Sequence, residues 1–205
     1  APITTVALVP NIMVVAETSP YKTVKDVVAA AKAKPDTLSY GSNGNGTAQH
    51  MIGTQFQMLT GTEILHVPYK GSGQAIADVL AGQVQVFITT PPSVMQHVQG
   101  GKLKALAVTT PQRSSALPGV PTMEEAGLKG YQVFAWFGLA APAGLPAPVQ
   151  QKIEQALERM AQQPDVKAAI QKAGAEPTWV NAQGMTSFMQ ADTAQWKSVA
   201  AYAKI

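Results

Sequence analysis

The residues best suited to chemistry form a glycine-rich stretch over residues 40–50, which reads YGSNGNGTAQH. Its three glycines allow a tight turn that exposes successive backbone N–H groups. Ser42 and Thr47 add hydroxyl donors, and a helix that begins after the turn adds partial positive charge. This pattern indicates an anion site without a formal cation, or else a plain strand-to-helix turn that Thr47 caps. The residues expected to contact an anion here are Ser42, Asn43, Gly44, Gly46 and Thr47.

The spacing of the glycines disfavours a nucleotide phosphate. Gly41 and Gly46 fit the phosphate-loop pattern G-x-x-x-x-G-K-[ST], but Thr47 stands where that pattern requires lysine. The dinucleotide pattern G-x-G-x-x-G is not met either, because the order here is G-x-x-G-x-G. A carboxylate fits better, since two or three neutral donors satisfy it.

Two further segments lie between an expected strand and an expected helix. Residues 66–73 (HVPYKGSG) offer the charge of Lys70, which is either a ligand contact or a solvated turn lysine. Residues 87–93 (FITTPPS) offer Thr89, which either donates to a ligand or caps the next helix. The carboxyl ends of parallel strands share one edge of a sheet, so these loops are expected to meet the glycine-rich one. The contacts expected from them are Tyr69, Lys70, Gly71 and Thr89.

His50 follows the glycine-rich turn by one helical turn, where it either faces the ligand or packs inside the protein. A histidine beside an anion site keeps an α/β enzyme with His50 as its base open as an alternative function. Other catalytic signatures are weak, because the three histidines lack metal-ligand spacing and the chain has no cysteine and no G-x-S-x-G elbow. We therefore expect no reaction, no cofactor and no metal ion.

The composition narrows the class of protein. The chain has 205 residues, of which 46% are hydrophobic and 13% are charged, as in a folded protein with a core. Its 15 basic residues are spread along the chain, so we expect no nucleic-acid partner. Its apolar runs fall short of the roughly 20 residues of a membrane helix, so we do not expect it to be membrane-embedded. The chain opens in a strand without a signal peptide, and we expect residues to be missing upstream.

Alternating strands and helices must position these loops. Strands are expected over residues 4–9, 12–16, 38–40, 64–67, 84–88 and 103–109. Helices are expected from Thr23, which begins a capping-box-like sequence, and around residues 51–59, 75–80 and 95–98. Gly61 should end the second of these helices. This alternation predicts βαβ units and a mainly parallel sheet.

The second half of the chain is richer in helix. A long β run is expected over residues 131–140. Helical patterns follow over residues 149–160, from Pro164 to about Lys172, and from about Asn181. With so few strands of its own, this half is expected to belong to a domain whose sheet partners lie elsewhere.

The three loops in this order resemble the substrate-binding proteins of tripartite tricarboxylate transporters, the Bug family of bacterial periplasmic proteins. The resemblance covers nearly the whole chain. The matching segments are residues 40–50, 66–73, 102–109, 118–127, 136–148 and 174–177.

The resemblance implies a type II periplasmic-binding fold, in which two α/β domains close on a small carboxylated ligand without catalysis. By analogy, residues 10–128 form one complete parallel-sheet domain, and residues 1–9 and 129–205 form an incomplete second α/β domain. It also implies an extracytoplasmic, periplasmic receptor that delivers a mono- or dicarboxylate to membrane transporter subunits. The effector-sensing domain of a transcription regulator can share this architecture and stays open as an alternative.

Two further expectations follow from the resemblance. Many family members carry an aspartate after the third strand, where this chain has Thr89, so plain carboxylates should bind better than amino acids. If the protein consists only of this chain, residues 131–140 form an unpaired strand and the helices over 149–162 and 181–202 lack a sheet. Self-association or loose order of that half is then expected.

Overall fold

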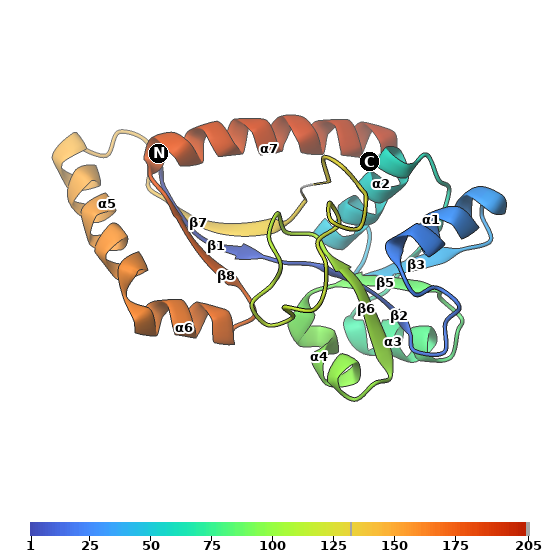
Figure 1. The fold of residues 1–205 in the computed structure, drawn as a ribbon. Coiled ribbons are helices and arrows are strands. Elements are labelled where there is room, and N and C mark those ends of the chain that lie inside the picture. The colour runs from blue at the N-terminus through green and yellow to red at the C-terminus, as the bar shows by residue number, and fades with distance from the viewer. Residues whose placement is uncertain (132, 204–205) are drawn as a thin grey trace. The chain divides into compact units, whose positions relative to one another are not determined.

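A computed structural model of the protein describes residues 1–131 and 133–203. By their contacts these residues divide into two units (Figure 1). The first unit comprises Ala1–Val9 and Ala135–Ser198, and the second comprises Pro10–Phe134 and the C-terminal residues from Val199. The assignment of residues 10–128, and of residues 1–9 with 129–205, to the two domains of a receptor stays a prediction.

A five-stranded sheet forms the centre of the second unit (Figure 1). Its strands, in the order β4-β3-β5-β2-β6, are β4 (Leu65–Pro68), β3 (Ser39–Ser42), β5 (Val86–Thr89), β2 (Ile12–Ala16) and β6 (Leu103–Val108). β3 is parallel to β4 and β5, whereas β2 is antiparallel to both β5 and β6. The predicted α/β class is confirmed, with the difference that one central strand reverses direction and makes the sheet mixed.

Helices cover both faces of this sheet. They are α1 (Val24–Ala33), α2 (Ala48–Thr60), α3 (Ser72–Leu80) and α4 (Pro91–Gln99). Val79 of α3 and Val94 of α4 share one apolar cluster with Phe87 of β5. On the other face, Val27 of α1 and Phe56 of α2 surround a small cavity with residues of β2, β3 and β5. The second unit is therefore a three-layer α/β/α sandwich.

Local signals in the sequence set the ends of two of these helices. The side chain of Thr23 accepts a hydrogen bond from the backbone N–H of Asp26, and the Asp26 carboxylate accepts one from the N–H of Thr23. This reciprocal pair is the predicted capping box. Gly61 ends α2 in the left-handed region, with φ of 59°, where a residue without Cβ is favoured.

The first unit contains a three-stranded sheet. β1 (Pro2–Val9) lies in the middle and pairs antiparallel with β7 (Ala135–Ala140) and β8 (Glu176–Val180). The helices here are α5 (Ala147–Gln162), α6 (Pro164–Lys172) and α7 (Ala182–Ala203), of which the residues from Val199 belong to the second unit. Trp136 of β7 packs edge-on against Phe188 of α7, with ring centroids 5.3 Å apart, and its Nε1 donates to Asp192 at 3.0 Å.

Three expectations for this unit were wrong. The strand expected over residues 131–140 begins only at Ala135. Tyr131 is instead buried in the second unit, where it donates its hydroxyl proton to the carbonyl of Ile52. Residue 132 lies outside the described residues. The strand is not unpaired, because β1 returns to pair with it, and α5 does have a sheet to cover in β1 and β8. β8 itself was not anticipated.

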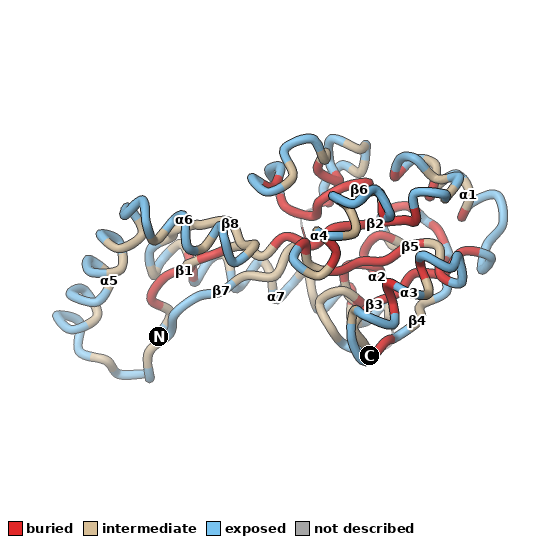
Figure 2. The backbone as a smooth tube through the Cα atoms, turned by 90° about the horizontal axis from the view of Figure 1, so that it is seen from below, coloured by how far each residue is buried: buried red, intermediate tan, exposed pale blue. Residues whose placement is uncertain are grey.

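The packing of the first unit is nevertheless open. Figure 2 shows its burial concentrated in β1, whereas α5 and α6 contain no buried residue. On β7, Phe137 is 65% exposed. Self-association through such apolar surface stays a prediction.

Candidate functional site

The three loops singled out in the sequence lie at one edge of the five-stranded sheet. β3, β4 and β5 run parallel, and each is followed within six residues by the first residue of α2, α3 or α4, respectively. The residues that precede the first turns of these helices are Thr47, Gly71 and Thr90. Three helix N-termini therefore direct partial positive charge to the same edge.

Hydrogen bonds join the first two loops. The backbone N–H of Tyr69 donates to the carbonyl of Ser42 at 3.0 Å. The hydroxyl of Ser72 lies 3.3 Å from Asn43 Oδ1, to which it donates. The glycine-rich loop and the start of α3 are thus in contact, as expected for loops that follow neighbouring parallel strands.

The hydroxyls of the glycine-rich loop are engaged within the loop. Ser42 Oγ, which is fully buried, accepts from the N–H of Gly44 at 3.1 Å and lies 2.6 Å from His66 Nε2. Thr47 Oγ1 accepts from the N–H of His50 at 3.4 Å and donates to the carbonyl of Gly44 at 2.8 Å. Thr47 is therefore the cap of α2, and direct ligand contact by either hydroxyl stays a prediction.

The conformation of this loop requires glycine at two positions. Gly44 has φ of +127° and Gly46 has φ of +72°, both unfavourable for residues with a side chain.

The N–H of Gly46 donates to His50 Nδ1 at 3.1 Å. Because Nδ1 accepts this bond, it carries no proton, and neutral His50 holds its proton on Nε2.

Other backbone N–H groups at this edge have no acceptor among the described residues. They include those of Ala48 and Gln49 in the first turn of α2 and those of Ser72 and Gly73 in the first turn of α3. Gly71 precedes α3 and has no side chain with which to cap it. α4 offers fewer donors, because it opens with two prolines, which lack an N–H. The donors available to an anion therefore lie at the starts of α2 and α3.

The two histidines beside the loop are stacked. The rings of His50 and His66 are nearly parallel, with centroids 4.0 Å apart, and Tyr40 stacks on His66 at 4.9 Å. Burial lowers the pKa of His50, and burial together with the neighbouring His50 lowers the pKa of His66 to about 4. Both imidazoles are therefore neutral at pH 7, and they position the loop through Ser42 and Gly46.

This arrangement predicts that the protein loses stability in mild acid. The folded protein keeps His66 neutral, so unfolding takes up a proton below the ordinary pKa of 6.5. The contribution of neutral His66 to the free energy of unfolding is fully present above pH 6.5 and is lost as the pH falls toward about 4. Because the ring is only half-buried, we expect a loss on the order of 1–2 kcal/mol in the free energy of unfolding. Urea unfolding at each pH measures it.

Two histidine variants isolate this effect from the carboxylates, of which Asp26 and Glu125 also have lowered pKa values. In His66→Gln, the free energy of unfolding should change less between pH 5 and 7 than in the wild type. His97→Gln, which changes the histidine outside the stack, should keep the pH dependence of the wild type. Equal slopes in the wild type and His66→Gln would contradict the assignment.

The second loop supplies one engaged and one exposed side chain. The hydroxyl of Tyr69 donates to Asp78 Oδ2 at 2.7 Å, and burial and this bond raise its pKa to about 12. Lys70 is exposed. Ligand contact by Tyr69, Lys70 and Gly71 stays a prediction.

The third loop brings Thr89 to the edge, together with a residue that sequence reasoning missed. Thr89 is completely buried, and its Oγ1 has no hydrogen-bond partner among the described residues. Because β2 is antiparallel, its first residue Ile12 pairs with Thr89, which brings the preceding Asn11 to the same edge. Asn11 Oδ1 accepts a hydrogen bond from Gln49 of α2 at 3.0 Å, while its buried Nδ2 has no partner within residues 1–131 and 133–203. The only signal in the sequence was the Pro10-Asn11 break before the strand.

The part of the chain that the structure describes lacks two kinds of feature. No group of three or more histidine, aspartate or glutamate side chains there is placed to hold a metal ion. No helix there combines the length and the apolar character needed to cross a membrane.

Comparison with known proteins gives a match over the length of the chain. The model of a family described as the tripartite tricarboxylate transporter family receptor, TctC, matches residues 1–203. Protein BugT of Bordetella pertussis is 30% identical over 198 residues, which are 97% of this chain and 61% of BugT. The chain thus spans less than two thirds of the length of the first curated relatives that it matches.

Solved structures agree with the fold. Rpa4515 of R. palustris, solved with adipate, is 32% identical with a TM-score of 0.79, and the match covers 100% of this chain and 68% of that one. MatC (Rpa3494) of Rhodopseudomonas palustris, solved with bound malate, is 26% identical with a TM-score of 0.72. The match covers 97% of this chain and 68% of MatC. The predicted periplasmic-binding fold class is confirmed by these matches.

Proposed function

Because the chain belongs to the family of tripartite tricarboxylate transporter receptors, we propose that the protein is a periplasmic solute-binding receptor for a small mono- or dicarboxylate. It captures the ligand outside the cytoplasm and delivers it to the membrane subunits of a transporter. The relatives solved with adipate and with malate support a carboxylate as the ligand.

One observation carries the proposal for this chain. The unpaired N–H groups at the starts of α2 and α3 converge on the edge of the sheet beside the glycine-rich loop. Neutral donors at helix N-termini satisfy a carboxylate, and hydrogen bonds to a charged group contribute about 1.5–3 kcal/mol each. The exposed Lys70 adds charge near the same edge.

The geometry of His50 favours a receptor over an enzyme. Its Nδ1 already accepts the N–H of Gly46, and its ring is covered by His66. A general base needs a free nitrogen within reach of the substrate proton, and here Nδ1 is occupied in holding the loop. The family match likewise favours a receptor over the effector domain of a transcription regulator.

Thermal unfolding with a panel of carboxylates tests the proposal. A ligand that binds only the folded protein stabilises it by about 2.7 kcal/mol at 100 times its dissociation constant. We expect adipate, malate or a related mono- or dicarboxylate to raise the melting temperature by several degrees. The matching amides, which lack the charge, should not. A panel in which no carboxylate shifts the transition would contradict the proposal.

A further inference from the structure

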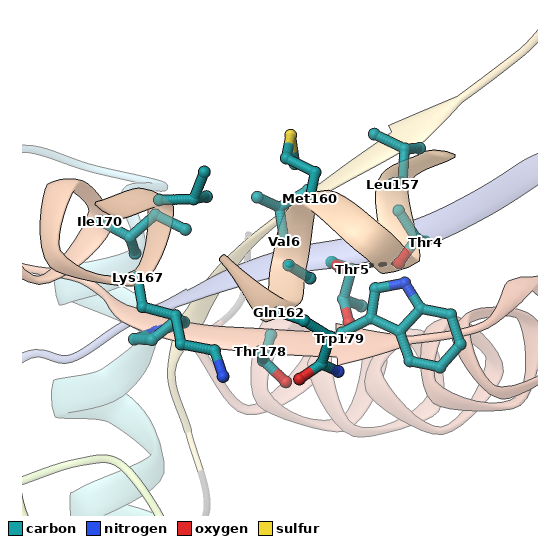
Figure 3. Close-up of a pocket in the computed structure, with 13 residues that line it drawn as sticks. Thr4, Thr5, Val6, Leu157, Met160, Gln162, Lys167, Ile170, Thr178 and Trp179 are labelled. Carbon is teal, nitrogen blue, oxygen red and sulfur yellow. Dashed lines mark hydrogen bonds between the residues drawn. The ribbon is translucent and has the colours of Figure 1, made fainter. Parts of the chain in front are cut away.

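The first unit contains a pocket of about 280 Å³ between its sheet and helices α5 and α6 (Figure 3). Nothing in the proposed carboxylate site uses it, because that site is built from loops of the second unit. One part of its wall is apolar, formed by Leu157 and Met160 of α5 and by Val166 and Ile170 of α6. Such a wall suits a hydrocarbon group.

Another part of the lining is polar and carries a charge. Lys167 of α6, Gln162 at the end of α5 and Thr178 of β8 line the pocket, and Figure 3 shows their polar ends pointing to the same side. These three side chains make no hydrogen bond or ion pair with any residue that the structure describes. A free lysine with a neutral amide and a hydroxyl is a set of donors suited to a carboxylate.

Two polar groups of the lining are buried without a partner among the described residues. Thr5 is only 3% exposed, and its Oγ1 has no hydrogen-bond partner among the described residues; the Nε1 of Trp179, which also lines the pocket, has none either. Buried polar groups without partners are uncommon in folded proteins and call for an explanation. A ligand that carries oxygen would supply acceptors beside them.

We propose that this pocket binds a small amphipathic carboxylate. The carboxylate lies against Lys167, Gln162 and Thr178, and the hydrocarbon chain lies against Leu157, Met160 and Ile170. With roughly 30 Å³ for each water-sized group, the volume fits about ten non-hydrogen atoms, the size of octanoate. One lysine balances a single negative charge, so a monocarboxylate fits better than a phosphate or a dicarboxylate.

Titration with sodium octanoate, followed by tryptophan fluorescence and calorimetry, tests the site. We expect saturable binding that changes the emission of Trp179, with the change lost in Trp179→Phe. Lys167→Ala should weaken binding about tenfold. Lys172→Ala, on the same helix but outside the lining, is the matched control and should bind like the wild type. 1-Octanol, which lacks the charge, should bind more weakly than octanoate.

Two results would overturn the inference. One is the absence of saturable octanoate binding, or equal binding by Lys167→Ala and Lys172→Ala. The other is loss of octanoate binding in Ala48→Pro, which changes only the start of α2. That second result would place octanoate at the edge of the five-stranded sheet, so the proposed function would stand while this pocket would not.

Discussion

Replacing Thr89 with aspartate should lower the affinity for a plain dicarboxylate such as succinate on the order of 100-fold, about 2.7 kcal/mol. Thr89 is completely buried at the edge of the sheet beside the loops proposed to bind the carboxylate. A buried negative charge there would repel a carboxylate with little screening by water. Aspartate, whose amine can pair with the new carboxylate, should lose less affinity, so the preference shifts toward the amino acid.

Calorimetry of succinate and aspartate at pH 8, where the new carboxyl is ionised, measures both changes. Thr89→Asn has the shape of the aspartate variant without its charge, and should keep the preference of the wild type for succinate. If the wild-type protein binds aspartate more tightly than succinate, the account of selectivity at Thr89 is wrong.

Replacing Gly53 with alanine is expected to lower the free energy of unfolding by about 2–3 kcal/mol. A Cβ at this position of α2 would overlap the ring of Tyr40. The ring has little room to move, because Tyr40 is 2% exposed, stacks on His66 and donates its hydroxyl proton to the carbonyl of His50 at 3.3 Å. The clash would push α2 away from β3 and disturb the loop between them.

Gly73→Ala is the control for this substitution. Gly73 also lies in a helix, but a Cβ added there would meet no atom of another element within 4 Å. Alanine there should leave stability unchanged or raise it by about 0.5–1 kcal/mol, because alanine favours the helix. Urea unfolding compares the two variants. If Gly53→Ala were as stable as the wild type, the packing of α2 on Tyr40 would have to leave room for a methyl group, which contradicts this prediction.

The features that local sequence determines could be predicted. Thr23 and Asp26 form the capping box, and Gly61 ends α2, because a cap depends on residues within one turn. The placement of three loops at one edge also followed from the alternation of strands and helices. Each of these inferences needs only the neighbours in the chain and the period of the apolar residues.

Features that depend on distant residues could not be predicted. An apolar run such as that of β2 has the same pattern in either direction, so the place of Asn11 at the edge that carries the three loops was missed. β8 was missed because it is short, contains Pro177 and exists only by pairing with β1. Likewise, only the folded structure shows that the N–H of Gly46 is bonded to His50, whereas that of Ala48 has no acceptor among the described residues.

The most direct test of the account removes a single N–H donor from the proposed carboxylate site. Ala48 is the first residue of α2, where proline is tolerated, and the extended backbone of Thr47 is compatible with a following proline. Ala48→Pro therefore deletes one donor while keeping the helix. Ala48→Ser keeps the donor and serves as the control.

Calorimetric titration with the tightest carboxylate of the panel should show one site in the wild-type protein. Loss of a hydrogen bond to a charged group costs about 1.5–3 kcal/mol of binding free energy, so Ala48→Pro should weaken binding about tenfold or more. Ala48→Ser should stay within about threefold of the wild type. Equal affinity in Ala48→Pro and the wild type would contradict the claim that the start of α2 binds the carboxylate.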